Sequence, residues 1–172
     1  MSNNIFSHII RFFVLILLQV YVLNNILFFN IINPYVYIYF ILLLPFELPP
    51  VLITFLSFLI GISVDFFAGT IAINAFASTI AGYMRPFILK LFSPHDGYEK
   101  NSAPTIAFYN INWWIKYAMF ITLIHHSVLF FTETFHFHAV LYTIAKIIVS
   151  SALSLILMIL MQYFFHKSSK KL

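Results

Sequence analysis

The chain has 172 residues with a formal net charge of +4; 62% of them are hydrophobic, only 8% are charged, and the mean hydropathy is +0.97. A soluble domain of this length carries about a quarter charged residues and cannot bury so much apolar surface in its own core. This composition excludes an ordinary soluble domain and predicts an integral membrane protein, built of helices because the apolar stretches are long and do not alternate.

The first apolar segment is expected over residues 9–29. Arg11 is its only early charge, the apolar run continues past Phe28, and no small-residue cleavage site follows. The segment is therefore interpreted as a retained first helix rather than a signal peptide. Its polar interruptions, Gln19 and the pair Asn24 and Asn25, favour hydrogen bonds to neighbouring helices.

Five more segments are expected at residues 35–48, 51–67, 72–92, 113–131 and 137–165, with a polar cytoplasmic loop at 93–112. Pro45, Pro49 and Pro50 surround Glu47, and prolines break helices, so this stretch predicts a turn between the second and third segments. The second segment has about 11 residues before Pro45, which is short for a helix that must cross a bilayer. The sequence leaves open whether it continues as a kinked helix. The prediction is a single domain, residues 1–172, with six transmembrane helices.

Eight of the nine lysines and arginines lie at or near one side of this layout: Arg11, Arg85, Lys90, Lys100, Lys116 and the three lysines of the C-terminal tail. The expected opposite loops, about residues 30–34, 69–71 and 132–136, contain neither. By the positive-inside rule both chain ends are expected in the cytoplasm. The basic stretch from His166 to Lys171 is too small to indicate nucleic acid and is interpreted as a membrane-proximal anchor.

The third segment carries a carboxylate among small residues, in the order Ser57, Gly61, Asp65 and Gly69. A spacing of four places them along one stripe of a helix. Small residues let membrane helices approach closely, and the fourth segment offers its own at Ala75, Ser78, Ala81 and Gly82. A tight hairpin of the two helices is expected. An ionisable residue in a membrane helix needs a reason: Asp65 is either a packing device, a proton or ligand site, or a determinant of partner binding.

Depth in the bilayer restricts the partners of Asp65. Arg85 is expected at the inner end of the fourth helix, whereas Asp65 lies near the outer end of the third, so these two should not pair. Lys146 lies in the outer third of the sixth helix and has a flexible stem. An Asp65–Lys146 ion pair is therefore the hypothesis.

Histidines follow in the fifth segment and after it. His125 and His126 lie inside the segment, and Glu133, His136 and His138 cluster at its outer end. The cluster has the chemistry of metal ligands but no recognised metal motif, so no metal is expected. Cysteine is absent, and no hydrolase, phosphate-binding or kinase motif occurs. The expectation is a protein without enzymatic activity or cofactor.

From residue 55 to residue 86 the chain resembles the MreD family of bacterial rod shape-determining proteins, in particular Bacteroidetes-like members. The resemblance rests on a G-x-x-x-D helix, an Ala-rich stretch and a Tyr-x-Arg-Pro ending, carried by Gly61, Asp65, Ala75, Ala77, Tyr83, Arg85 and Pro86. Gln19 and the turn at Pro45 also resemble the family. Ala72 or Ile73 stands where a glycine is usual, and Asn74 where a basic residue is frequent.

The resemblance implies a scaffold in the bacterial inner membrane that contributes to peptidoglycan synthesis and cell shape. Its implied partners are MreC, the actin-like MreB filament, and a RodA-type glycosyltransferase with its transpeptidase, besides the surrounding membrane lipid. The third and fourth helices, including Arg85 and Pro86, are the expected docking surface for MreC.

The resemblance also implies a fold similar to the substrate-binding subunits of energy-coupling-factor transporters. The alternative function is therefore a membrane subunit that binds a vitamin-like small molecule. Those subunits tend to carry an A-x-x-x-A stripe on the first helix, and the stretch IIRFFVLILLQVYVL has neither alanine nor glycine. This difference disfavours the alternative.

Overall fold

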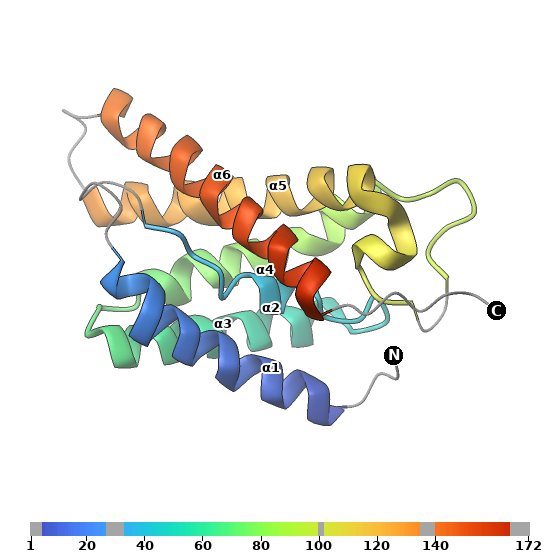
Figure 1. Ribbon diagram of the computed structural model, residues 1–172, viewed down its shortest axis with the longest axis horizontal. Helices are drawn as coiled ribbons and strands as arrows, with labels where there is room; N and C mark the ends of the chain where they lie inside the picture. Colours follow the sequence, from blue (N-terminus) through green and yellow to red (C-terminus); the bar gives the residue numbers. More distant parts are fainter. Residues whose placement is uncertain (1–4, 27–32, 100–101, 135–139, 166–172) are drawn as a thin grey trace.

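The computed structural model describes residues 5–26, 33–99, 102–134 and 140–165, and this part of the chain is helical without strands (Figure 1). The α-helices are α1 (Ile5–Leu17), α2 (Tyr39–Leu42), α3 (Pro50–Ala68), α4 (Ile73–Leu91), α5 (Ile106–Thr134) and α6 (Val140–Phe165). Four stretches are long and apolar enough to cross a membrane: Ile5–Asn25, Pro50–Ala68, Ile111–Thr134 and Val140–Phe164. The prediction of a helical membrane protein is confirmed.

The first spanning stretch changes its winding after α1. It continues as one π-helical turn, Leu18–Val22, and one 3₁₀ turn, Leu23–Asn25. The Asn25 side-chain amide donates to the main-chain carbonyls of Val20 and Tyr21. Asparagine side chains that bond nearby backbone groups compete with regular helix hydrogen bonding, which explains the irregular winding at this end.

The expected second transmembrane helix at 35–48 is not a helix over most of its length. Within residues 33–48, named here the crossing segment, only the single turn α2 is α-helical, and residues 33–36 have irregular backbone. The segment runs through the middle of the bundle (Figure 1). Irregular chain advances further per residue than the 1.5 Å of a helix, so a short apolar stretch between Pro34 and Pro45 suffices.

Helices α3 and α4 form a tight antiparallel hairpin. Pro50 stands at the first position of α3, where its missing N–H is not needed. Gly69 ends the helix with φ = 69°, a left-handed conformation that glycine adopts without a steric penalty. Ala72 precedes α4 with φ = 56°. Pro86 lies inside α4 and supplies no N–H to the helix there.

The loop after α4 leads into a kinked α5. The helix has a break at Asn110, where φ is 64° and ψ is 164°. The Asn110 side chain accepts a 3.0 Å hydrogen bond from the Trp113 main-chain N–H, which is the geometry of a helix N-cap. The long apolar stretch of α5 therefore begins just after this cap, at Ile111. The part of α5 before the break lies within residues 93–112, which were expected to be a loop.

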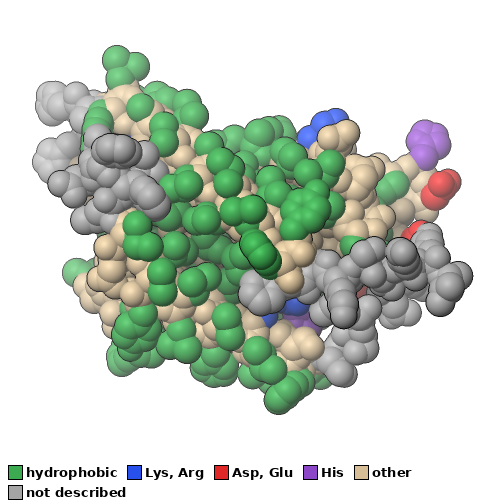
Figure 2. Space-filling model, viewed as in Figure 1, with side chains coloured by type: hydrophobic (Ala, Val, Ile, Leu, Met, Phe, Trp, Pro, Cys, Tyr) green, Lys and Arg blue, Asp and Glu red, His purple; other side chains and the backbone are tan. Residues whose placement is uncertain are grey.

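The start of α1 and the end of α6 lie at the same end of the molecule as the loop between α4 and α5 (Figure 1). Apolar side chains cover much of the face that carries α1 and α6 (Figure 2). Large exposed apolar residues occur on every long helix, for example Phe13, Phe66, Phe76, Phe131 and Ile148. In a lipid environment such residues are in their preferred solvent.

Candidate functional site

The central part of the crossing segment, residues 36–44, is enclosed by the helices. Every residue from Val36 to Leu44 is at most 3% exposed. Non-helical backbone at membrane depth is tolerated only where protein or a cavity supplies its hydrogen-bond partners. The polar side chains of the surrounding helices supply them here, and they form the candidate functional site.

Gln19 bonds the beginning of the crossing segment. Its side-chain oxygen accepts from the Val36 main-chain N–H at 2.8 Å, and its amide nitrogen donates to the Pro34 carbonyl at 3.1 Å. The same nitrogen donates to the Asn24 side chain at 2.8 Å. Gln19 was expected to bond neighbouring helices. It bonds instead the irregular backbone of the crossing segment and the side chain of Asn24 in its own segment.

Ser154 and His126 hold the next residue, Tyr35. The Tyr35 main-chain N–H donates to Ser154 Oγ at 2.9 Å, and His126 Nε2 lies 3.2 Å from the same oxygen. His126 Nδ1 bonds the Thr122 carbonyl at 2.9 Å. A carbonyl only accepts, so the ring proton is on Nδ1, Nε2 accepts, and the Ser154 hydroxyl donates to it. Ser154 on α6 is thus bonded both to His126 on α5 and to the backbone of the crossing segment.

Arg85 and Tyr117 bond the crossing segment at the end of α2 and just after it. Arg85 is fully buried; its Nη2 donates to the Leu44 carbonyl and its Nε to the Tyr117 hydroxyl at 2.8 Å. The Tyr117 hydroxyl in turn donates to the Leu42 carbonyl at 3.1 Å. Arg85 Nη1 has no hydrogen-bond partner among the described residues. The arginine of the Tyr-x-Arg-Pro ending therefore bonds the Leu44 carbonyl directly and the Leu42 carbonyl through the Tyr117 hydroxyl.

Tyr37 is the centre of a second buried network. Its hydroxyl lies 2.6 Å from His125 Nε2, 3.2 Å from Asn74 Oδ1 and 3.1 Å from Ser78 Oγ. These residues come from the crossing segment, α5 and α4, so one phenol connects three parts of the bundle. His125 Nδ1 has no partner in the described part of the chain.

Asp65 caps the helix that follows its own. Its Oδ1 accepts from the Asn74 main-chain N–H at 3.1 Å and its Oδ2 from the Ala75 main-chain N–H at 2.8 Å. Oδ1 also accepts from the Asn74 side chain at 2.9 Å and from the Thr70 hydroxyl. The first N–H groups of a helix lack intrahelical partners, and a carboxylate there also complements the helix dipole.

The small-residue stripe of α3 is used inside the chain. A Cβ on Gly61 would lie 2.6 Å from the Ala75 Cα and from the Asn74 carbonyl oxygen, and a Cβ on Gly82 would overlap the Ser57 side chain. Ser57 itself is fully buried. The surface expected to receive a partner helix is therefore filled by α4, whereas Gly69, at the end of the stripe, has open space around it.

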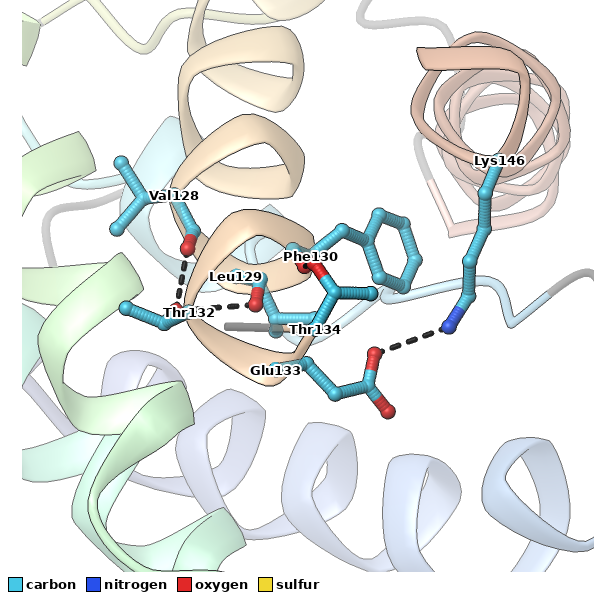
Figure 3. Close-up of polar contacts among 7 residues, drawn as sticks. All are labelled: Val128, Leu129, Phe130, Thr132, Glu133, Thr134 and Lys146. Carbon is cyan, nitrogen blue, oxygen red and sulfur yellow. Dashed lines mark hydrogen bonds and ion pairs between the residues drawn. The ribbon is translucent and has the colours of Figure 1, made fainter. Parts of the chain in front are cut away.

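Lys146 pairs with Glu133 and not with Asp65. The Lys146 ammonium lies 2.9 Å from Glu133 Oε2 and 4.3 Å from the centre of the Phe130 ring (Figure 3). Glu133 ends α5 in a turn whose Thr132 and Thr134 hydroxyls donate back to carbonyls of the same helix. The Asp65–Lys146 hypothesis is therefore wrong, because the carboxylate of α3 is saturated by α4 and the lysine reaches α5.

The expected cluster at the outer end of α5 falls partly outside the described residues, which include Glu133 but not His136 or His138. Within the described ranges no group of three histidine, aspartate or glutamate side chains is placed to hold a metal ion.

An aromatic cluster closes the opposite end of the bundle, beside the turn after α2. Phe46 stacks on Tyr98 with ring centres 4.3 Å apart, and Trp113 stacks on Tyr117 at 5.2 Å. The Tyr98 hydroxyl donates to the Leu89 carbonyl at 2.6 Å. Partial burial raises the pKa of Tyr98 to about 12. The Trp114 indole is fully buried and donates to the Pro104 carbonyl.

Sequence reasoning missed three residues that matter in this site: Tyr37, Tyr117 and Ser154. Tyr37 and its neighbour Tyr39 are buried in the crossing segment. The only available signal was their position in an apolar stretch too short for a spanning helix. No family model matches the chain, and no curated protein and no solved structure matches it.

Proposed function

We propose that the protein is a non-catalytic membrane scaffold of the kind that the MreD resemblance implies, in the bacterial inner membrane with both chain ends in the cytoplasm. One observation carries the proposal. The two ionisable residues of the MreD-like motif, Asp65 and Arg85, bond main-chain groups of the chain itself. Because these side chains bond the chain's own backbone, they fix the helices relative to one another. A scaffold requires such a rigid arrangement.

The other buried polar residues support the same conclusion. Gln19, Tyr117 and Ser154 each bond the main chain of the crossing segment. Membrane helices associate through close packing and a few hydrogen bonds, so such contacts hold six chain segments in one arrangement. A bundle of this kind, with the fold proposed to resemble energy-coupling-factor substrate-binding subunits, presents a fixed apolar surface to other membrane proteins.

In this proposal the protein binds MreC and thereby connects MreB filaments with the RodA-type glycosyltransferase and its transpeptidase. The stripe at Gly61 packs on α4, so a docking surface for MreC has to lie on a different, lipid-exposed face. Substitution of Gly61 consequently tests folding and not docking.

Depletion in the native cell tests the proposal. Loss of the protein should turn rods into spheres and reduce lateral wall synthesis, and expression of the unaltered chain should restore both. Co-purification from detergent extracts should recover MreC. Cells that stay rod-shaped after depletion, with unchanged wall incorporation, would exclude the function.

The alternative, a small-molecule-binding membrane subunit, is favoured by one feature. Discontinuous, non-helical segments at membrane depth are the places where transporters hold substrates, and the crossing segment is such a segment. Neighbouring genes for MreC and a transpeptidase would support the scaffold, whereas a vitamin operon or riboswitch would support transport. A vitamin that raises the melting temperature of the purified protein would also support transport.

A further inference from the structure

A continuous chain of hydrogen bonds links α5, the crossing segment, α4 and α3. His125 Nε2 lies 2.6 Å from the Tyr37 hydroxyl, which also bonds Asn74 Oδ1 at 3.2 Å. The Asn74 amide nitrogen donates to Asp65 Oδ1 at 2.9 Å. All four side chains are buried. The chain therefore runs from an imidazole ring at one end to a carboxylate at the other.

The hydrogen-bond partners assign the protons of this chain. The single Tyr37 proton goes either to His125 Nε2 or to Asn74 Oδ1. In the first case the ring proton is on His125 Nδ1, a buried atom without a partner among the described residues, and Asn74 Oδ1 loses its donor. In the second case Nε2–H donates to the tyrosine oxygen, and only the Nδ1 lone pair is unpaired. The second arrangement leaves fewer groups unpaired, so His125 Nδ1 is a free acceptor inside the bundle.

The surroundings of His125 offer no direct partner for a positive charge. The ring makes no ion pair with a carboxylate of the described residues. The neutral rings of Tyr35, Tyr37 and His126 lie around it, with ring centres 6.0, 5.3 and 5.5 Å away. Charged side chains of the surrounding helices bond other groups: Asp65 the start of α4, Arg85 the Leu44 carbonyl, and Lys146 the Glu133 carboxylate.

We propose that His125 Nδ1 is a proton-binding site whose occupation releases the crossing segment from α5. A hydronium ion gives its proton to the Nδ1 lone pair and leaves as water, and the ring becomes a cation. A buried cation without an anion in contact costs more free energy than one hydrogen bond to a phenol supplies. The charged ring therefore turns toward water, and its bond to Tyr37 breaks.

The release is local to one end of the crossing segment. Tyr37 keeps its hydrogen bonds to Asn74 and Ser78 on α4 when the bond to α5 is lost. The other end of the segment stays bonded through Arg85 and Tyr117, which do not contact the histidine. Acid thus loosens residues 35–38 and leaves the α3–α4 hairpin in place. The inference concerns the isolated chain and goes beyond the scaffold function, so the two stand or fall separately.

Hydrogen–deuterium exchange of the full chain in detergent, at about pH 5 and pH 7.5, tests the site. An opened histidine has the ordinary pKa of about 6.5, so at pH 5 the open population should rise about thirtyfold. After correction for the intrinsic pH dependence of exchange, the amides of residues 35–38 should exchange faster by that factor. Amides of residues 57–64 in α3 should change little. An increase below about threefold at residues 35–38 would overturn the proposal.

Matched variants identify the titrating group. His125→Gln keeps groups that can bond Tyr37 but does not titrate, so its exchange at residues 35–38 should be the same at both pH values. His95→Gln removes an exposed histidine of the loop after α4 and should keep the full acid response. An undiminished acid response in His125→Gln would overturn the proposal.

Tyr37→Phe gives a second, independent test that does not alter the histidine. It removes the hydroxyl that His125 bonds, so residues 35–38 should exchange rapidly already at pH 7.5, with little further change at pH 5. An acid response in Tyr37→Phe as large as in the unaltered chain would also overturn the proposal, because the bond that the proton is said to break is absent there.

Discussion

The Asp65 carboxylate accepts a 2.8 Å hydrogen bond from the main-chain N–H of Ala75, ten residues later and in the next helix. With its other oxygen on the Asn74 N–H, one side chain of α3 satisfies two of the orphan donors at the start of α4. This relationship explains why a carboxylate is retained in a membrane helix without a basic partner. It also makes the start of α4 depend on the Asp65 side chain.

Replacement of Asp65 should therefore unfold the hairpin more easily. We expect Asp65→Ala to lower the free energy of unfolding by about 2 kcal/mol, since both N–H groups lose their acceptor. Asp65→Asn should lower it by about 1 kcal/mol, because one oxygen remains. Thermal unfolding in detergent measures both. An Asn variant more damaging than the Ala variant would contradict the capping role.

The closest helix approach gives a compensated pair of substitutions. Gly82→Ala should destabilise the protein by about 1–3 kcal/mol, because its Cβ overlaps the Ser57 side chain. Ser57→Gly in the same chain removes the overlapping atoms and should recover most of the loss. Gly69→Ala serves as the control. Its Cβ meets no atom within 4 Å, so only the strain of φ = 69° remains, about 1 kcal/mol. Failure of Ser57→Gly to rescue would show that the contact is not the cause.

Tyr117→Phe tests the support of the crossing segment. The variant leaves Arg85 Nε without its acceptor and the Leu42 carbonyl without its donor, inside the bundle. We expect a loss of about 1–3 kcal/mol in thermal unfolding. Tyr83→Phe is the matched control. Tyr83 is 57% exposed, and its hydroxyl forms no hydrogen bond to another described residue. Equal melting temperatures for the two variants would contradict the role given to Tyr117.

A double-mutant cycle distinguishes the two possible partners of Lys146. The coupling free energy between Glu133→Gln and Lys146→Met should be about 0.5 kcal/mol, small because Glu133 is 43% exposed. The coupling between Asp65→Asn and Lys146→Met should be zero within error. A measurable coupling in the second cycle would restore the ion pair that the structure contradicts.

Alkaline pH should weaken the contact between Tyr98, in the loop after α4, and the Leu89 carbonyl of α4. The pKa of Tyr98 is raised to about 12 by partial burial, above the value of about 10 for an unfolded chain. A raised pKa means that the folded state favours the neutral phenol, so its contribution is complete below pH 10 and is lost as the pH rises through 12. The melting temperature should fall over this window, and less so in Tyr98→Phe. Identical pH profiles would exclude the contribution.

Local chemistry of the sequence was sufficient to predict the class of protein and several helix ends. Hydropathy adds up along a stretch of chain, so the spanning helices α3 and α6 are visible without a structure. The proline at 50 and the glycine at 69 delimit α3 because their backbone preferences are intrinsic to each residue. The close α3–α4 approach follows from small residues at matching intervals.

Only the tertiary structure decided what the polar residues do. The partner of Asp65 is an N–H group that exists in every residue, and hence no sequence pattern points to it. Lys146 had two carboxylates in reach by depth alone, and the packing of α6 on α5 selected Glu133. The crossing segment resembles a helix in composition. It runs as irregular chain because distant side chains such as Gln19 and Arg85 satisfy its backbone, and such long-range compensation is not written in any local window of residues.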